Sequence, residues 1–202
     1  MEFIKHHLYH IYNQGNNKQS IFFSKKNYLF FVKKMKTYIM PYADVLAWCL
    51  MPNHFHLMVC VNHEGLPIQD FTSIETQNSE TNKQRTFNQS IGILLRSYTR
   101  AINKQENRSG SLFRKETKAK CITCQNGYTP NYFNKQFGTA INLNLPEKQY
   151  PQVCFDYIHQ NPVVAGLVNT IEDWEFSSAK DYYGERNGSL INKKVAKTFI
   201  DY

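Results

Sequence analysis

Two histidines separated by a single residue have the spacing of a shared metal site. His54 and His56 lie in the segment 51–59, where His and Met alternate with apolar residues. Alternate side chains of a strand point to opposite faces, so both imidazoles should lie on one face, about 7 Å apart. Two neutral imidazoles at that separation can bind one divalent ion. A polar surface pair without metal has the same spacing, so the spacing alone leaves both interpretations open.

The residues before this pair predict the element that holds it. Residues 44–51 are almost all apolar, which is typical of a buried strand in the centre of a sheet. Pro52 and Asn53 then make a tight connection into the histidine strand. We therefore expect an antiparallel hairpin that holds His54 and His56 rigidly on a central strand.

Apolar residues at helical spacing predict two long helices, over residues 28–39 and 85–105. Asn161-Pro162 is expected to end a third helix. We expect a single domain over residues 1–180. Its other segments are a strand starting at residue 8, a polar loop at 62–83, a strand at 118–123 and the third helix at 150–160. A tail with a short basic helix follows at 181–202.

The helix at 85–105 carries a tyrosine and a row of basic residues. Tyr98 lies within the apolar stripe, and this position alone predicts a tyrosine buried in the core. The basic residues recur every four positions, which is typical either of a solvated face or of a track that binds phosphates. Further basic and aromatic residues follow, so we favour contact with DNA. The residues of this track are Arg96, Arg100, Lys104, Arg108, Arg114 and Lys115.

The composition favours a soluble globular protein with a polyanionic partner. The 202 residues carry a formal net charge of +8, and 42% of them are hydrophobic. No apolar stretch is long enough for a membrane helix, and the first residues lack the apolar region of a signal peptide. We therefore expect a cytoplasmic protein.

The five cysteines form no paired framework of the secreted kind. Three of them lie in apolar runs, which predicts buried, reduced thiols. Cys121 and Cys124 have the CxxC spacing of zinc ligands. Without a second such pair or a neighbouring histidine in the sequence, this spacing only weakly predicts zinc.

Four sequence blocks, taken together, resemble a known family. The segment MPNHFH at residues 51–56 resembles the HUH motif of single-tyrosine transposases, in particular the REP-associated tyrosine transposases and their insertion-sequence relatives. The other blocks are similar to the first strand, the tyrosine helix with its exit, and the late helix of that family. They are YHIYNQG at 9–15, YTRAIN at 98–103 with RSGSLF at 108–113, and YIHQNPVVAGL at 157–167.

The resemblance implies an α+β fold, namely a ferredoxin-like antiparallel sheet of four to five strands with helices packed on one face. It also implies that Tyr98 is the nucleophile and that His54 and His56 bind Mg²⁺ or Mn²⁺. A third ligand is expected from the tyrosine helix about one turn later. Ile102 occupies that place and cannot bind metal, so Asn103 is the nearest amide.

The reaction implied by the resemblance is cleavage and rejoining of single-stranded DNA, at element ends that form hairpins. The intermediate would be a 5′-phosphotyrosine with a free 3′-hydroxyl. Mobile relatives work as dimers, so a monomer and a homodimer both stay open. Two other functions also stay open, a non-catalytic module that binds single-stranded nucleic acid and a metal-dependent phosphodiesterase that uses water.

Overall fold

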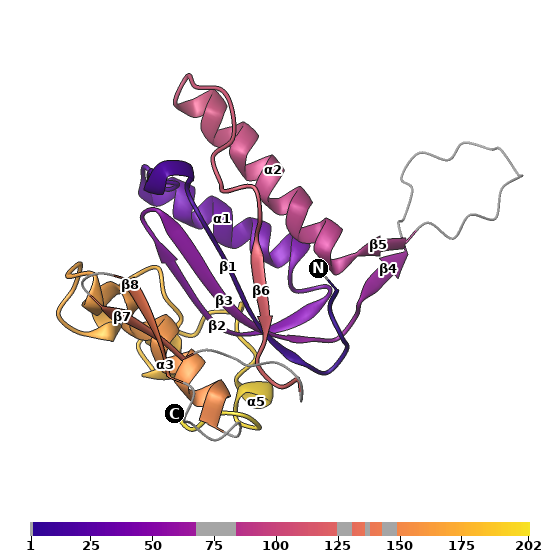
Figure 1. The fold of residues 1–202 in the computed structure, drawn as a ribbon, viewed down its shortest axis with the longest axis vertical. Coiled ribbons are helices and arrows are strands. Elements are labelled where there is room, and N and C mark those ends of the chain that lie inside the picture. Colours follow the sequence, from indigo (N-terminus) through magenta and orange to yellow (C-terminus); the bar gives the residue numbers. More distant parts are fainter. Residues whose placement is uncertain (1, 68–83, 125–130, 136–137, 143–148) are drawn as a thin grey trace, which may run out of the picture.

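A computed structural model describes residues 2–67, 84–124, 131–135, 138–142 and 149–202 (Figure 1). Along these residues no helix is long and apolar enough to cross a bilayer. The elements are β1 (Leu8–Gln14), α1 (Lys25–Tyr38), β2 (Ala43–Met51), β3 (His54–Val61), β4 (Gly65–Pro67), β5 (Gln84–Thr86), α2 (Phe87–Gln105), β6 (Lys118–Cys121), β7 (Asn131–Lys135), β8 (Gly138–Asn142), α3 (Tyr150–Val164), α4 (Ala179–Tyr182) and α5 (Lys193–Ala196), with short 3-10 helices at Asn16–Lys18 and Ile171–Asp173.

The main sheet is antiparallel, and in the described part of the chain it has four strands in the order β2-β3-β1-β6. Its strands and the two long helices follow along the chain as β1, α1, β2, β3, α2 and β6, which is the ferredoxin-like order. Met51 pairs with His54, so Pro52 and Asn53 form the expected tight connection. The predicted fold class and the hairpin are confirmed, and the histidine strand β3 lies in the interior of the sheet.

Helices lie on both faces of this sheet, whereas the sequence predicted one face (Figure 1). The helices α1 and α2 cover one face, where Phe31 and Leu94 join Leu57 in the larger core. On the opposite face, α3 contributes Phe155 and Ile158 to a second, smaller core. The second layer was not predicted, because helical periodicity shows that a helix has a buried side but not which face of a sheet it covers.

Strand β2 lies at the edge of the sheet, so the prediction of a central position for its apolar residues is wrong. Later parts of the chain bury its outer edge. Leu50 N–H donates to the carbonyl of Phe176, and Ser178 N–H donates to the carbonyl of Trp48. Ile191 forms a parallel bridge with Val45. A strand covered along its edge can be as apolar as a central one.

A side-chain cap fixes the start of α2. Thr86 Oγ1 accepts from Gln89 N–H at 3.2 Å, and Gln89 Oε1 accepts from Thr86 N–H at 2.9 Å. This reciprocal pair satisfies two backbone donors at the helix start. The helix therefore begins at Phe87, two residues later than predicted.

Helix α3 continues through Asn161-Pro162 to Val164, about one turn beyond residue 160, where the sequence predicted its end. Pro162 falls in the last turn, so its missing N–H removes only one bond near a terminus. The helix stops at Gly166, whose φ of +67° suits glycine, and whose N–H donates to the carbonyl of Val163. Asn161 is consequently helical and lies one turn after Tyr157, on the same side of α3.

Two predicted segments lie at the margins of the domain. Most of the predicted polar loop, residues 68–83, lies outside the described residues, and its two flanks pair as β4 and β5. The predicted tail at 181–202 packs against the sheet, with Leu190 and Ile200 buried. Helix α4 crosses the predicted boundary between residues 180 and 181.

His159 of α3 has a structural role. It is buried, and its Nε2 lies 2.7 Å from Ser178 Oγ. Ser178 Oγ also donates to the carbonyl of Trp48 at 3.2 Å, which leaves Nε2–H of His159 as the donor to Ser178. Burial lowers the pKa of His159 to about 3, and the nearby carboxylate of Asp181 opposes this shift. The folded protein therefore holds this imidazole neutral.

We predict that His159 makes the protein sensitive to acid. The unfolded chain takes up a proton on His159 near pH 6.5, whereas the folded protein excludes it. The contribution of the neutral imidazole to the unfolding free energy is therefore complete above pH 6.5 and is lost as the pH falls toward 3. At about pH 4.5 the loss should be about 3 kcal/mol. His159→Gln keeps a donor for Ser178, and its unfolding free energy, from urea titrations, should fall less steeply with acidification. Equal slopes for the two proteins would contradict this account.

Candidate active site

His54 and His56 lie on the face of the sheet that α3 covers. Strand alternation places Phe55 and Leu57 in the opposite core, and the two imidazole rings lie 5.0 Å apart between centroids. His56 is only 5% exposed. The structure thus brings the pair together as predicted, in a largely buried position that does not suit a solvated surface pair.

Hydrogen bonds fix the protonation of these rings. His54 Nδ1 lies 2.6 Å from Asn53 Oδ1, which can only accept, so Nδ1 carries the proton and Nε2 keeps its lone pair. His56 Nδ1 lies 2.9 Å from His10 Nε2 on β1, so one ring donates to the other. When His56 is the donor, its Nε2 also keeps a lone pair. Such partners at the second ring nitrogen are typical of histidines that bind metal.

Burial keeps all three imidazoles neutral. It lowers the pKa of His10 to about 3 and, with charge repulsion from His10 and His54, lowers that of His56 well below its usual value. Burial also lowers the pKa of His54, and a side-chain hydrogen bond with Asn161 partly offsets this. Neutral imidazole is the form that binds a metal ion.

Helix α3 supplies a tyrosine and an amide to this pair. The Tyr157 ring lies 5.3 Å from the His56 ring and 5.9 Å from the His10 ring, edge-on to both. The side chain of Asn161, one turn later, interacts with both Tyr157 and His54, and it opposes the effect of burial by lowering the pKa of Tyr157 and raising that of His54. Its Nδ2 also donates to the carbonyl of Tyr157 at 2.7 Å, which fixes the amide against the helix.

These side chains line one cavity of about 420 Å³, which therefore joins the histidine strand, β1, β6 and α3. Burial raises the pKa of Tyr157 to about 12, and the hydrogen bond with Asn161 opposes this rise. Its hydroxyl is thus protonated at neutral pH and needs activation before it can attack. The lining residues are Tyr12, Asn13, Gln14, His54, His56, Arg114, Glu116, Lys118, Tyr157 and Asn161.

The structure corrects the expected position of Tyr98. It is fully buried in the core between α2 and the opposite face of the sheet, so the sheet separates it from His54 and His56. Its hydroxyl donates to the carbonyl of Ile21 at 2.7 Å, and burial raises its pKa. Tyr98 is therefore a core residue, as its periodicity alone predicted. Its hydroxyl has no access to His54 and His56.

Asn103 does not line the cavity of the histidines either. Its Nδ2 donates to the carbonyl of Gly110 at 2.8 Å, and its Oδ1 is buried without a hydrogen-bond partner among the described residues. It lines a second cavity of about 460 Å³, formed by α2 and the segment that follows. The expected contribution of Asn103 to the metal ligands is therefore corrected as well.

The second cavity gathers most of the predicted phosphate track. Four of the six residues of the track line the second cavity. Asn13 and Arg114 line both cavities, so the two cavities lie next to each other. Lys104 is exposed at the end of α2 and is not among the lining residues, and Arg108 instead donates to Gln19 Oε1 at 2.7 Å. The four that line the cavity are Arg96, Arg100, Arg114 and Lys115.

Sequence reasoning missed Tyr157, Asn161 and His10 as site residues. The signals were present, since Tyr157 and Asn161 are four residues apart in a segment that resembled the family. They were misjudged because the helix was expected to end at Asn161. His10 lies in the block at 9–15 that resembles the first strand of the family, but no role was predicted for it.

The fold is similar to that of a solved protein structure. No protein-family model matches the chain, and no curated protein matches it in sequence. Among solved structures it is similar to a REP-associated tyrosine transposase bound to a REP hairpin, with a TM-score of 0.54 and 16% identity. The match covers 95% of this chain and 86% of that chain. At this identity the likeness shows a shared fold, so function has to be argued from the site.

We predict that Tyr98 matters for stability. Tyr98→Phe leaves the buried carbonyl of Ile21 without its donor, which should lower the unfolding free energy by about 1–3 kcal/mol. Tyr183, which is 60% exposed, provides a matched control, and Tyr183→Phe should change stability by less than about 0.5 kcal/mol. Chemical denaturation measures both. Two variants of equal stability would show that the Tyr98 hydroxyl does not hold the core.

Proposed function

We propose that this chain cleaves and rejoins single-stranded DNA as a tyrosine transposase does, with Tyr157 as the nucleophile. The observation that carries the proposal is the cavity in which Tyr157 of α3 faces His54 and His56 of β3. The fold likeness to a tyrosine transposase bound to a DNA hairpin supports it. The basic side chains beside the cavity suit a phosphate backbone.

The residues of the cavity fit a divalent metal. The ligands would be the neutral imidazoles of His54 and His56 and the amide oxygen of Asn161. His54 carries its proton on Nδ1, and His56 shares a proton with His10 through Nδ1. Glu116 adds a carboxylate to the same cavity. Nitrogen with oxygen donors suits Mn²⁺ and admits Mg²⁺. When bound, such an ion supplies Lewis-acid polarisation of the scissile phosphate.

The chain's own residues would carry the covalent step. The Tyr157 oxygen attacks phosphorus and gives up its proton, and the bond from phosphorus to the 3′ oxygen breaks as that oxygen takes up a proton. The products are a 5′-phosphotyrosine and a free 3′-hydroxyl. The reverse attack, by a 3′-hydroxyl on the phosphotyrosine, rejoins DNA without an external energy source.

Other residues would position the DNA. Arg114 lies at both cavities, so a strand that enters the first can continue along Arg96 and Arg100 in the second. Tyr12 in the first cavity offers a ring on which a base can stack. Because Tyr157 and both histidines belong to one chain, a homodimer is not needed to complete this site.

We predict that Tyr157→Phe abolishes the covalent product. The test incubates labelled single-stranded hairpin oligonucleotides with protein and Mn²⁺, then runs denaturing gels. A protein-linked DNA band should form with the parent chain and fall by at least about 10³-fold in Tyr157→Phe, because the nucleophilic oxygen is gone. Tyr98→Phe, assayed at a temperature where it is folded, should keep the band.

The other results of this experiment separate the rival functions. Cleavage without a linked band that survives Tyr157→Phe would mean that water is the nucleophile, as in a phosphodiesterase. A band lost in Tyr98→Phe and kept in Tyr157→Phe would return the role to Tyr98. Tight binding without cleavage on a broad oligonucleotide pool would indicate a binding module.

We predict that Arg96 and Arg100 contact phosphates. The double variant Arg96→Ala/Arg100→Ala should bind single-stranded DNA more weakly, and the slope of log affinity against log salt should become less negative by about 1.4, which is about 0.7 for each contact. Lys26→Ala/Lys194→Ala removes two exposed lysines that line neither cavity, and it should keep the parent slope. Fluorescence anisotropy at several salt concentrations measures both. Equal slopes for the two double variants would exclude the track.

A further inference from the structure

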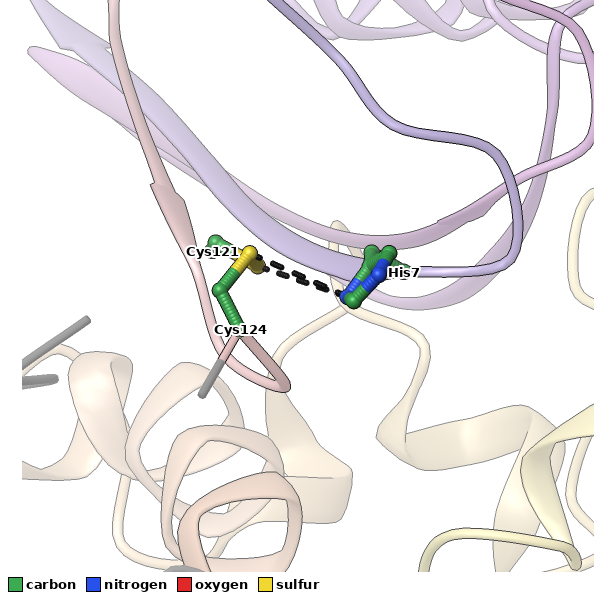
Figure 2. Close-up of side chains that lie close together, drawn as sticks. All are labelled: His7, Cys121 and Cys124. Atoms are coloured by element: carbon green, nitrogen blue, oxygen red, sulfur yellow. Dashed lines mark hydrogen bonds between the residues drawn. A yellow bond between two sulfur atoms is a disulfide. The ribbon is translucent and has the colours of Figure 1, made fainter. Parts of the chain in front are cut away.

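A second group of possible metal ligands lies at the other end of the β1–β6 pair (Figure 2). His7 precedes β1, Cys121 ends β6, and Cys124 lies in the turn beyond it. In the structure the two cysteines form a disulfide, and His7 Nδ1 lies 3.8 Å from each sulfur. All three residues are partly buried. The sequence showed the CxxC pair without a neighbouring histidine, because His7 is 114 positions away from Cys121.

Strand pairing fixes this arrangement. Tyr9 pairs with Cys121, and Ile122 N–H donates to the carbonyl of Leu8 at 2.8 Å, which sets His7 opposite the cysteines. Thr123, between the two cysteines, also contacts the ring, since its Oγ1 accepts from Leu8 N–H at 3.0 Å and lies 3.1 Å from His7 Nδ1. An ion on Nδ1 would replace this second contact. The imidazole is therefore already directed at the sulfurs.

The distances are close to those of a tetrahedral zinc site. Zinc binds thiolate sulfur at about 2.3 Å and imidazole nitrogen at about 2.1 Å, so a sulfur and a nitrogen on one ion lie about 3.6 Å apart. The separations of 3.8 Å to both sulfurs in the structure are close to this value. Two-electron reduction of the disulfide by an external thiol or phosphine would give two thiols and let the sulfurs separate. The ion would then lie between three ligands that the fold has already gathered.

We propose that the reduced chain binds one Zn²⁺ through His7 Nδ1 and the thiolates of Cys121 and Cys124. A water molecule or another donor takes the fourth position. Binding releases the two thiol protons, and the disulfide form lacks both sulfur ligands. The ion would link the start of β1 to the end of β6. These two strands contribute Tyr12 and Lys118 to the first cavity. The site is separate from His54 and His56, so this proposal does not depend on the proposed function.

The experiment uses cobalt as the probe, because a band from sulfur-to-cobalt charge transfer reports thiolate ligands. The full chain carrying His54→Ala and His56→Ala, which lacks the other imidazole pair, is reduced and titrated with Co²⁺ and then with Zn²⁺. We expect the charge-transfer band to saturate at one equivalent and to disappear as zinc displaces cobalt. The parent chain, titrated in parallel, should show the same band.

Variants test each ligand against a matched control. Cys121→Ser/Cys124→Ser should lose the band, while Cys154→Ser keeps it. His7→Ala should weaken zinc affinity by more than about 100-fold, which exceeds the usual effect of losing a residue that only supports a ligand. His6→Ala removes the adjacent exposed histidine and should leave the affinity unchanged.

Three results would overturn the proposal. In the first, the thiols of the reduced chain react with a thiol reagent but the chain shows no charge-transfer band. In the second, the band persists in the double serine variant. In the third, His6→Ala and His7→Ala have equal zinc affinities. The first would mean that the pair is a disulfide only. It comes from the chain with both cysteines present, so it remains decisive if the serine variants fail to fold.

Discussion

The two-residue period of β3 is the constraint on which the rest of this structure depends. It commits Phe55 and Leu57 to the core beneath α1 and α2, and thereby turns His54 and His56 to the opposite face. A slip of one residue in register would bury the imidazoles among phenylalanines. Strand β3 has a neighbour on both sides: Met51 of β2 pairs with His54, and Tyr12 of β1 pairs with His56. Pairing with either strand prevents the slip.

Helix α3 covers the second face at the histidines. By closing it, α3 removes the imidazoles from water and places Tyr157 and Asn161 beside them. The same burial that keeps the imidazoles neutral also raises the pKa of Tyr157 to about 12. In the proposed function, the imidazoles are thus in the form that binds metal, and the proposed nucleophile stays protonated without one. Both properties follow from one packing contact.

Much of this fold follows from local patterns, whereas the assignment of the tyrosine does not. Alternation and helical spacing correctly predicted the hairpin around Pro52-Asn53, the face of His54 and His56, and the two long helices. Tyr98 and Tyr157 both lie on the buried side of a helix that packs on the same sheet. Periodicity cannot distinguish the two faces, and the helix end was placed one turn too early, which hid Asn161. His7 meets Cys121 only through strand pairing, a non-local contact.

The two edges of the main sheet differ. Later segments cover β2, while among the described residues β6 has a strand neighbour only on the side of β1. An exposed strand edge can recruit a strand from another molecule and so begin aggregation. Lys118 and Lys120 lie on this short strand, and lysines there disfavour such recruitment because a second copy would bring like charges together. The positive charge of β6 would thus protect solubility as well as serve the cavity.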